Sequence, residues 1–203
     1  MTIRSAVIAA ATAATLFAAG NLSAQNESRP APQTKSRWEF LVLSGTLVPT
    51  GAQRDVIKRG DLSAAQLTFL VRPALALTAT GGWARSRDVS IGDTPKLDVF
   101  TYDVGTELRA PRWNVSETVS IASFAGAGAG AGGRSYNYRK LDVDATHNIA
   151  GYATVGTEVG IRKVHVRLEA RDYLTGFKPL SGIGAGRTGN DVVVMAGLRI
   201  GSR

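Results

Sequence analysis

Residues 164–171 read VHVRLEAR, and this stretch decides the fold class. Apolar and polar side chains alternate along its whole length. The polar face carries His165, Arg167, Glu169 and Arg171. An alternation with a period of two is typical of a β-strand that separates two different environments. The stretch therefore predicts a strand with one polar and one apolar face.

Segments of the same kind fill the chain from Trp38 onward. They are enriched in Val, Thr, Leu and aromatic residues, turn-rich stretches separate them, and none shows the 3.6-residue period of a helix. The predicted strands are residues 38–49, 64–72, 74–86, 98–110, 117–133, 147–160, 163–175 and 189–201. Together they predict an all-β fold, an eight-stranded antiparallel up-and-down transmembrane β-barrel.

The connections between these strands favour a membrane barrel. Three are tight turns, at residues 72–73, 111–114 and 160–162, and four are long and polar, at residues 50–63, 87–97, 134–146 and 176–188. Short turns on one side and long loops on the other are the layout of outer-membrane barrels. Strands of about 10 to 14 residues also match what crosses a hydrocarbon layer when tilted. We expect the short turns and both termini to face the periplasm.

Glycines indicate which face points into the barrel. Gly126, Gly128, Gly130 and Gly132 would share one face of the fifth predicted strand. Glycines weaken a water-exposed sheet face, but they relieve crowding inside a narrow barrel. We therefore expect the polar face to line the lumen and the apolar face to meet lipid. The alternative is a soluble, lipocalin-like periplasmic barrel that binds an apolar ligand inside.

Charged residues of both signs fall on the predicted lumen face. They are Arg72, Glu107, Arg109, Glu158, Arg167, Glu169, Arg171 and Arg199. Because an unpaired charge is costly in a confined space, we expect them to form a charge-paired network that plugs the lumen. A general diffusion pore is then excluded, and a small selective or gated pore is the alternative function.

Four aromatic residues are predicted to lie at the two membrane interfaces. Trp38 and Trp113 fall at the short-turn side, and Trp83 and Phe100 fall near the long-loop side. Aromatic girdles flank the apolar band of outer-membrane barrels on both sides. The alternative is that these rings are scattered core residues.

The N-terminus predicts export. A basic Arg4 precedes an apolar run from Ala6 to Ala19, and small residues lead to Ala24, which together form the pattern of a cleaved signal peptide. The run is shorter than the roughly 20 residues of a spanning helix. We therefore expect a signal peptide at residues 1–24, a flexible periplasmic leader at 25–37 and an outer-membrane barrel domain at 38–203. The predicted location is the cell outer membrane.

The composition of the chain limits the classes of molecule that it is expected to bind. The 203 residues carry a formal net charge of +8 and are 44% hydrophobic, which excludes a helical multi-span membrane protein and favours anionic partners. Export argues against nucleic acid. Basic residues of the long loops are expected to meet outer-membrane lipid and lipopolysaccharide phosphates, with ordinary solvated loop charge as the alternative. They are Arg54, Lys58, Arg59, Arg87, Lys96, Arg134, Arg139, Lys140, Lys178 and Arg187.

No motif indicates covalent chemistry. Residues 128–133 satisfy GxGxxG, but no helix pattern follows them, so we interpret them as barrel glycines. His147 and His165 begin no HExxH pattern, and Asp142 and Asp144 beside His147 are too few oxygens for calcium. We therefore expect no catalytic residue, metal site or cofactor.

Three segments carry a resemblance to a known family. They are Trp38-Glu39-Phe40 with Gly45, residues 166–173 (VRLEARDY), and Asn190-Asp191 with residues 196–199 (AGLR). Through them residues 38–203 resemble the OmpA-like and OmpX-like small outer-membrane β-barrel domains. The resemblance implies insertion by the barrel-assembly machinery, although the terminal aromatic residue usual in that family is missing from Leu198–Arg203.

The function that this sequence favours is non-enzymatic, a structural or surface-interaction role in the outer membrane. Some barrels of the resembled kind are lipid-modifying enzymes with a membrane-facing histidine. Here His165 falls on the predicted lumen face, and neither histidine begins a His-x-Ser pattern. A lipid-modifying enzyme therefore remains a less favoured alternative.

Overall fold

The structure is a computed structural model that describes residues 37–90, 92, 94–138, 141–162, 164–177 and 187–200. The predicted signal peptide at 1–24 lies outside these residues, as does the predicted leader except for Arg37. Within the described ranges, no helix is both long and apolar enough to cross a membrane.

Strands dominate the described chain. In chain order they are β1 (Trp38–Thr50), β2 (Gly60–Arg72), β3 (Leu75–Arg87), β4 (Lys96–Arg109), β5 (Trp113–Asn114), β6 (Val119–Tyr138), β7 (Leu141–Ile161), β8 (Val164–Phe177) and β9 (Arg187–Ile200). A short 3-10 turn, η1 (Gly51–Gln53), follows β1. The eight long strands match the eight predicted ones, with ends that differ by at most six residues.

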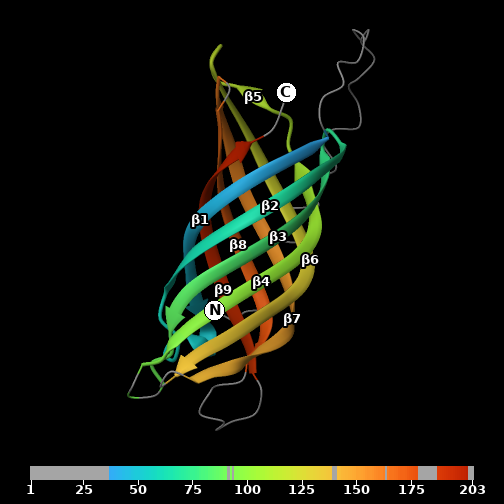
Figure 1. Cartoon of the computed structure of the whole chain (residues 1–203). Helices are drawn as coiled ribbons and strands as arrows, with labels where there is room; N and C mark the ends of the chain where they lie inside the picture. Colours follow the sequence, from blue (N-terminus) through green and yellow to red (C-terminus); the bar gives the residue numbers. More distant parts are fainter. Residues whose placement is uncertain are drawn as a thin grey trace.

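The strands close into a barrel. Each long strand pairs antiparallel with the next one in the chain, β9 pairs with β1, and β4 pairs with β6 past the short β5. Figure 1 shows the strands inclined to the barrel axis, with the start of β1 and the end of β9 at the end that carries β5. We call this the turn end, and we call the opposite end, with residues 51–59 and 88–90, the loop end. The prediction of an all-β, eight-stranded antiparallel barrel is confirmed.

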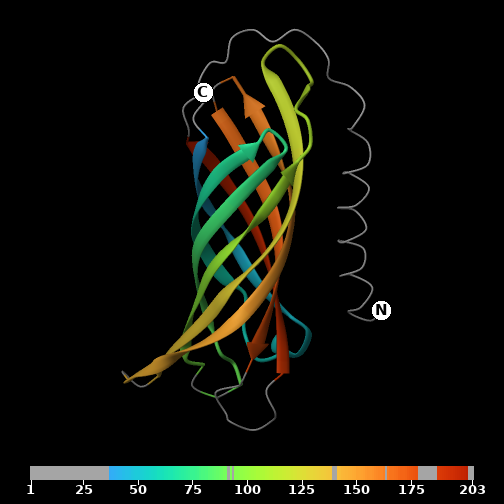
Figure 2. The ribbon, with the colours of Figure 1, turned by 90° about the vertical axis from the view of Figure 1, so that its right-hand side faces the viewer.

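Two connections differ from their predictions. The predicted long loop 134–146 is mostly strand, because β6 and β7 continue as a hairpin with only residues 139 and 140 between them. This hairpin projects beyond the other strands at the loop end (Figure 2). The predicted tight turn at 111–114 is part of a nine-residue connection, 110–118, that contains β5. The predicted lengths of these two connections were therefore wrong.

Alternation along the strands separates two environments as predicted. On β8, residues 165, 167, 169 and 171 are buried inside, whereas Val164 and Leu168 are exposed outside. β1 departs from this rule because Leu41 and Leu43 point inward and are buried, while Phe40 and Val42 point outward. Apolar residues thus occupy both faces of β1.

Glycines permit a close approach of β4, β6 and β7. Gly128 on β6 pairs with Gly105 on β4 and with Tyr152 on β7. A Cβ atom added at Gly128 would lie 2.6 Å from the Tyr152 ring and would overlap the carbonyl oxygen of Val104. The glycine face therefore points inward and makes room for Tyr152 in the lumen.

Candidate functional site

Arg171 on β8 is the centre of the buried network. Its guanidinium donates to both carboxylate oxygens of Asp103 on β4, at 2.9 and 3.0 Å, and to Oε1 of Glu169 at 2.7 Å. It also donates to Oε1 of Gln66 on β2 at 3.1 Å. The Tyr173 hydroxyl donates to Oδ2 of Asp103 at 2.6 Å. These bonds connect strands that lie across the lumen from each other.

Arg167 forms a second layer nearer the turn end. It donates to Oε2 of Glu107 at 2.6 Å and to Oε2 of Glu169 at 2.8 Å, so Glu169 joins the two layers. The guanidinium carbon lies 3.6 Å from the centroid of the Phe124 ring, which is within cation–π range. Both Arg167 and Glu107 are buried.

A third layer lies at the turn end. Glu39 on β1 forms ion pairs with Arg109 and with Arg199, each with a nitrogen–oxygen distance of 2.8 Å. Glu158 on β7 is paired with Arg199 at 3.2 Å and with Arg112 at 2.5 Å. Arg112 belongs to the connection between β4 and β6, so this connection reaches over the mouth of the barrel and into the network.

The network is balanced in charge. Its arginines are Arg109, Arg112, Arg167, Arg171 and Arg199, and its carboxylates are Glu39, Asp103, Glu107, Glu158 and Glu169. Five positive groups therefore face five negative groups. Buried ions need such partners because desolvation of an unpaired charge costs several kcal/mol.

The structure brings together seven of the eight predicted network residues. They are Glu107, Arg109, Glu158, Arg167, Glu169, Arg171 and Arg199. Sequence reasoning did not assign Glu39, Asp103 or Arg112 to the network. The position of Asp103 on the polar face of its strand was a usable signal, whereas Arg112 lies in a connection where no alternation exists.

The assignment of Arg72 to the lumen was wrong. Arg72 is exposed at the end of β2, where the register with β3 shifts between Leu70 and Arg72. Such a β-bulge adds a residue to one strand and breaks the alternation of faces. Every second residue from Gln66 faces the lumen only as far as the bulge, so the alternation does not extend to Arg72.

Replacement of Arg72 by alanine is expected to leave stability nearly unchanged. An exposed side chain without a described partner contributes within about 0.5 kcal/mol to the free energy of unfolding. Urea unfolding of the refolded Arg72→Ala variant in detergent micelles measures this. A loss as large as that from a network arginine would contradict the exposed position.

The loop-end half of the interior is mainly apolar. Its core includes Leu47, Leu62, Leu97, Val99 and Val193. Residues 51–59 fold over this core, with Gln53 and Ile57 buried. Above it, Arg134 donates to Oε1 of Gln53 at 2.6 Å and to Oδ2 of Asp191 at 2.9 Å.

The cavity beneath Arg134 is small. It is lined by residues that include Leu47, Val99, Tyr173 and Asp191, and its volume is about 10 Å³. That volume has room for about one water molecule. At this level of the barrel the interior therefore has room for little more than water.

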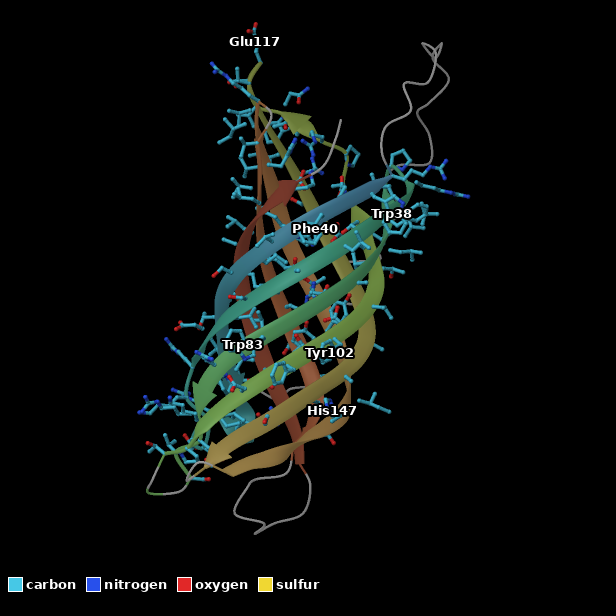
Figure 3. The ribbon with its side chains drawn as sticks, viewed as in Figure 1. Trp38, Phe40, Trp83, Tyr102, Glu117 and His147 are labelled. Carbon is cyan, nitrogen blue, oxygen red and sulfur yellow. The ribbon has the colours of Figure 1, made fainter. Side chains whose placement is uncertain are left out.

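The outer surface is apolar, with aromatic rings towards both ends. Trp38 packs on Phe69 at the turn end, with ring centroids 4.8 Å apart, and Trp113 is 72% exposed on β5. Trp83 and Phe100 pair across β3 and β4 nearer the loop end. Figure 3 shows Trp38 and Trp83 at these different levels. The assignment of these four residues to the two membrane interfaces stays a prediction.

The two histidines lie in different environments. His165 is buried in the turn-end network, with Nδ1 at 3.1 Å from a nitrogen of Arg112. His147 is exposed on the outside of β7. Among the described residues, no three metal-ligating side chains lie close enough to hold an ion, and the side chains of Asp142 and Asp144 are outside that description.

Comparison with known proteins shows similarity in structure only. No protein-family model matches the sequence, and no curated protein matches it. Neisserial surface protein A superposes with a TM-score of 0.62 at 10% identity, over 83% of this chain and 99% of that one. The N-terminal β-barrel domain of Pseudomonas aeruginosa OprF has a TM-score of 0.49 at 9% identity, over 82% and 99%.

An outer-membrane enzyme is also among the similar structures. PagL has a TM-score of 0.39 at 11% identity, over 81% of this chain and 99% of that one. The superposition on Neisserial surface protein A shows a common fold, and one fold serves many activities. The chain has the fold of the small eight-stranded outer-membrane β-barrels.

Proposed function

We propose that this protein is a non-enzymatic barrel of the bacterial outer membrane, closed to solutes, that presents a basic loop end to anionic groups at the cell surface. The observation that carries the proposal is the pairing of ionic groups across the lumen. Exported chains with such barrels are inserted by the barrel-assembly machinery, and we extend that expectation to this one.

The apolar outer surface supports membrane insertion. Exposed large apolar side chains include Phe40, Leu77, Val104, Leu168 and Leu198, which come from β1, β3, β4, β8 and β9. Such a surface is unfavourable in water, but it is the band that outer-membrane barrels present to lipid. It argues against a soluble periplasmic binder, whose apolar face would line the lumen.

The interior supports a closed barrel rather than a pore. Arg171 and Arg167 are each held by two carboxylates, so opening a water path would separate several buried ion pairs together. The apolar core and residues 51–59 close the loop end as well. A water path would have to separate the ion pairs and also displace the apolar core, and the free-energy cost of the two together would be large.

The position of His165 supports a role without lipid chemistry. Its ring lies inside the barrel against Arg112 and Glu158, where an acyl chain of the surrounding membrane does not reach. His147 faces outward, but within the described part of the chain it has no carboxylate partner that would orient it as a general base.

Planar-bilayer recording tests the closed state. The refolded protein should migrate differently on gels with and without boiling, as a folded barrel, and should show no discrete conductance steps. Discrete steps from the folded protein that change when Glu169→Gln is introduced would instead establish the pore. An altered lipid A mass after overexpression would establish the enzyme.

A further inference from the structure

Residues 51–59, which connect β1 and β2, form an ordered surface at the loop end, and we call this surface the platform. Val89 N–H donates to the carbonyl of Val56 at 2.7 Å, and Lys58 N–H donates to the carbonyl of Arg87 at 2.9 Å. The Ser86 hydroxyl also donates to the carbonyl of Lys58. Residues 51–59 are therefore held to the end of β3 by backbone pairing, which includes the bridge between Ile57 and Asp88.

A groove of about 530 Å³ lies on this platform. Val48, Pro49, Ile57 and Val89 contribute apolar groups to its lining. Its charged lining residues are Arg54, Lys58 and Arg59. The groove thus combines an alkyl lining with three cations, in a volume typical of small-ligand sites.

The three cations are available to a ligand. Arg54, Lys58 and Arg59 are all exposed, and within the described residues none has a salt bridge. Asp55 is the single carboxylate of residues 51–59, and it does not line the groove. Residues 51–59 therefore carry a formal charge of +2.

The groove adjoins the apolar outer surface. Val48 shares the outward face of β1 with Phe40 and Val42, and it pairs with Val192 of β9. An occupant could therefore keep its alkyl part beside Val48 while its head group reaches Arg54 and Arg59.

We propose that this groove binds the phosphate head group of a membrane lipid, with Arg54, Lys58 and Arg59 as its ligands and Val48 and Val89 against its alkyl portion. The inference rests on the proposed function, since it needs the loop end to face a lipid surface. Guanidinium groups suit phosphate because their N–H donors match two phosphate oxygens at once. The apolar lining favours a lipid over a free phosphate ion.

Lipid titration of the full chain in dodecylmaltoside micelles tests the proposal. Dioctanoyl phosphatidic acid should bind at least about 10-fold more tightly than dioctanoyl phosphatidylcholine, and inorganic phosphate should not bind measurably. The double variant Arg54→Gln/Arg59→Gln should weaken phosphatidic acid binding about 30-fold, because each cation near a charged lipid surface contributes about five-fold. Isothermal titration calorimetry gives these affinities.

The matched control removes two charges from the turn end. Arg37→Gln/Arg72→Gln should change the affinity less than about two-fold, since both residues are far along the chain from the groove and exposed at the other end. An equal loss in the control would overturn the groove in favour of overall charge. Binding of inorganic phosphate as tight as that of the lipid would overturn the lipid assignment.

Gel migration of the same samples distinguishes failure of the lipid-binding proposal from failure of the proposed function. A protein that shifts on heating but does not prefer phosphatidic acid contradicts the groove and leaves the barrel proposal standing. A protein whose gel band never shifts on heating, and which fractionates as a soluble species, contradicts both the groove and the outer-membrane barrel.

Discussion

Arg171→Met is expected to lower the free energy of unfolding by about 3–5 kcal/mol, which is the usual effect of removing one partner of a buried ion pair. Among the described residues, the substitution leaves Asp103 with the Tyr173 hydroxyl and no cation, and it leaves Glu169 with Arg167 and the Thr154 hydroxyl. Asp103 is buried, so water cannot replace the lost guanidinium. Urea unfolding in micelles, followed by tryptophan fluorescence, measures the loss.

The double variant Arg171→Met/Asp103→Asn is the control for this effect. It removes the stranded charge together with its partner, so most of the lost stability should return. If the double variant is as unstable as the single one, loss of packing around the guanidinium rather than a stranded charge explains the result. Arg171 lies between Tyr152 and Gln66, and that packing would then be the larger contribution.

Gly128→Val is expected to destabilise the barrel by about 3 kcal/mol or more, or to prevent it from reaching the heat-modifiable form. A side chain at this position would overlap the carbonyl of Val104, the Cα of Gly105 and the Tyr152 ring. Two of these three obstacles are backbone atoms of β4, so a change of rotamer cannot relieve the overlap. The fraction of protein that shifts on heating after refolding measures the effect.

Ala127→Val is the matched control for Gly128→Val. Ala127 is the adjacent residue on β6 and is exposed on the outer face, so the added methyl groups would meet lipid or detergent. This variant should refold as well as the original chain. Equal damage from both substitutions would mean that β6 tolerates no branched residue, and the inward crowding at Gly128 would not be the cause.

The alternation of side chains predicted most of the barrel. The VHVRLEAR stretch identified β8 and its faces, because a two-residue period is a local property of a strand. β1 could not be oriented in the same way, since Leu41 and Phe40 are both apolar while one points inward and the other outward. The extension of β6 and β7 through residues 134–138 and 141–146 was also missed, because polar residues there are typical of a loop as well as of a strand beyond the membrane.

The candidate network was predicted less completely than the fold. Arg167, Glu169 and Arg171 follow from the alternation of β8, but Arg112 enters the barrel from a connection, and Arg72 leaves it at a bulge. The alternation of polar and apolar side chains indicates neither the entry of Arg112 nor the bulge before Arg72. The groove formed by residues 51–59 with Val89 was likewise not predicted, since it needs two loops held side by side.

The sequence by itself determined where most of the strands lie and, on strands such as β8 where polar and apolar residues alternate, which side chains face the lumen, because both depend on neighbours along the chain. The tertiary structure alone decided which charged side chains pair with each other across the lumen. Arg171 and Asp103 are 68 positions apart, and Arg199 and Glu39 are 160 positions apart. Their pairing depends on the register of all the strands between them around a closed barrel. A one-residue shift in any of these strands would turn its side chains to the other face and leave a buried charge unpaired.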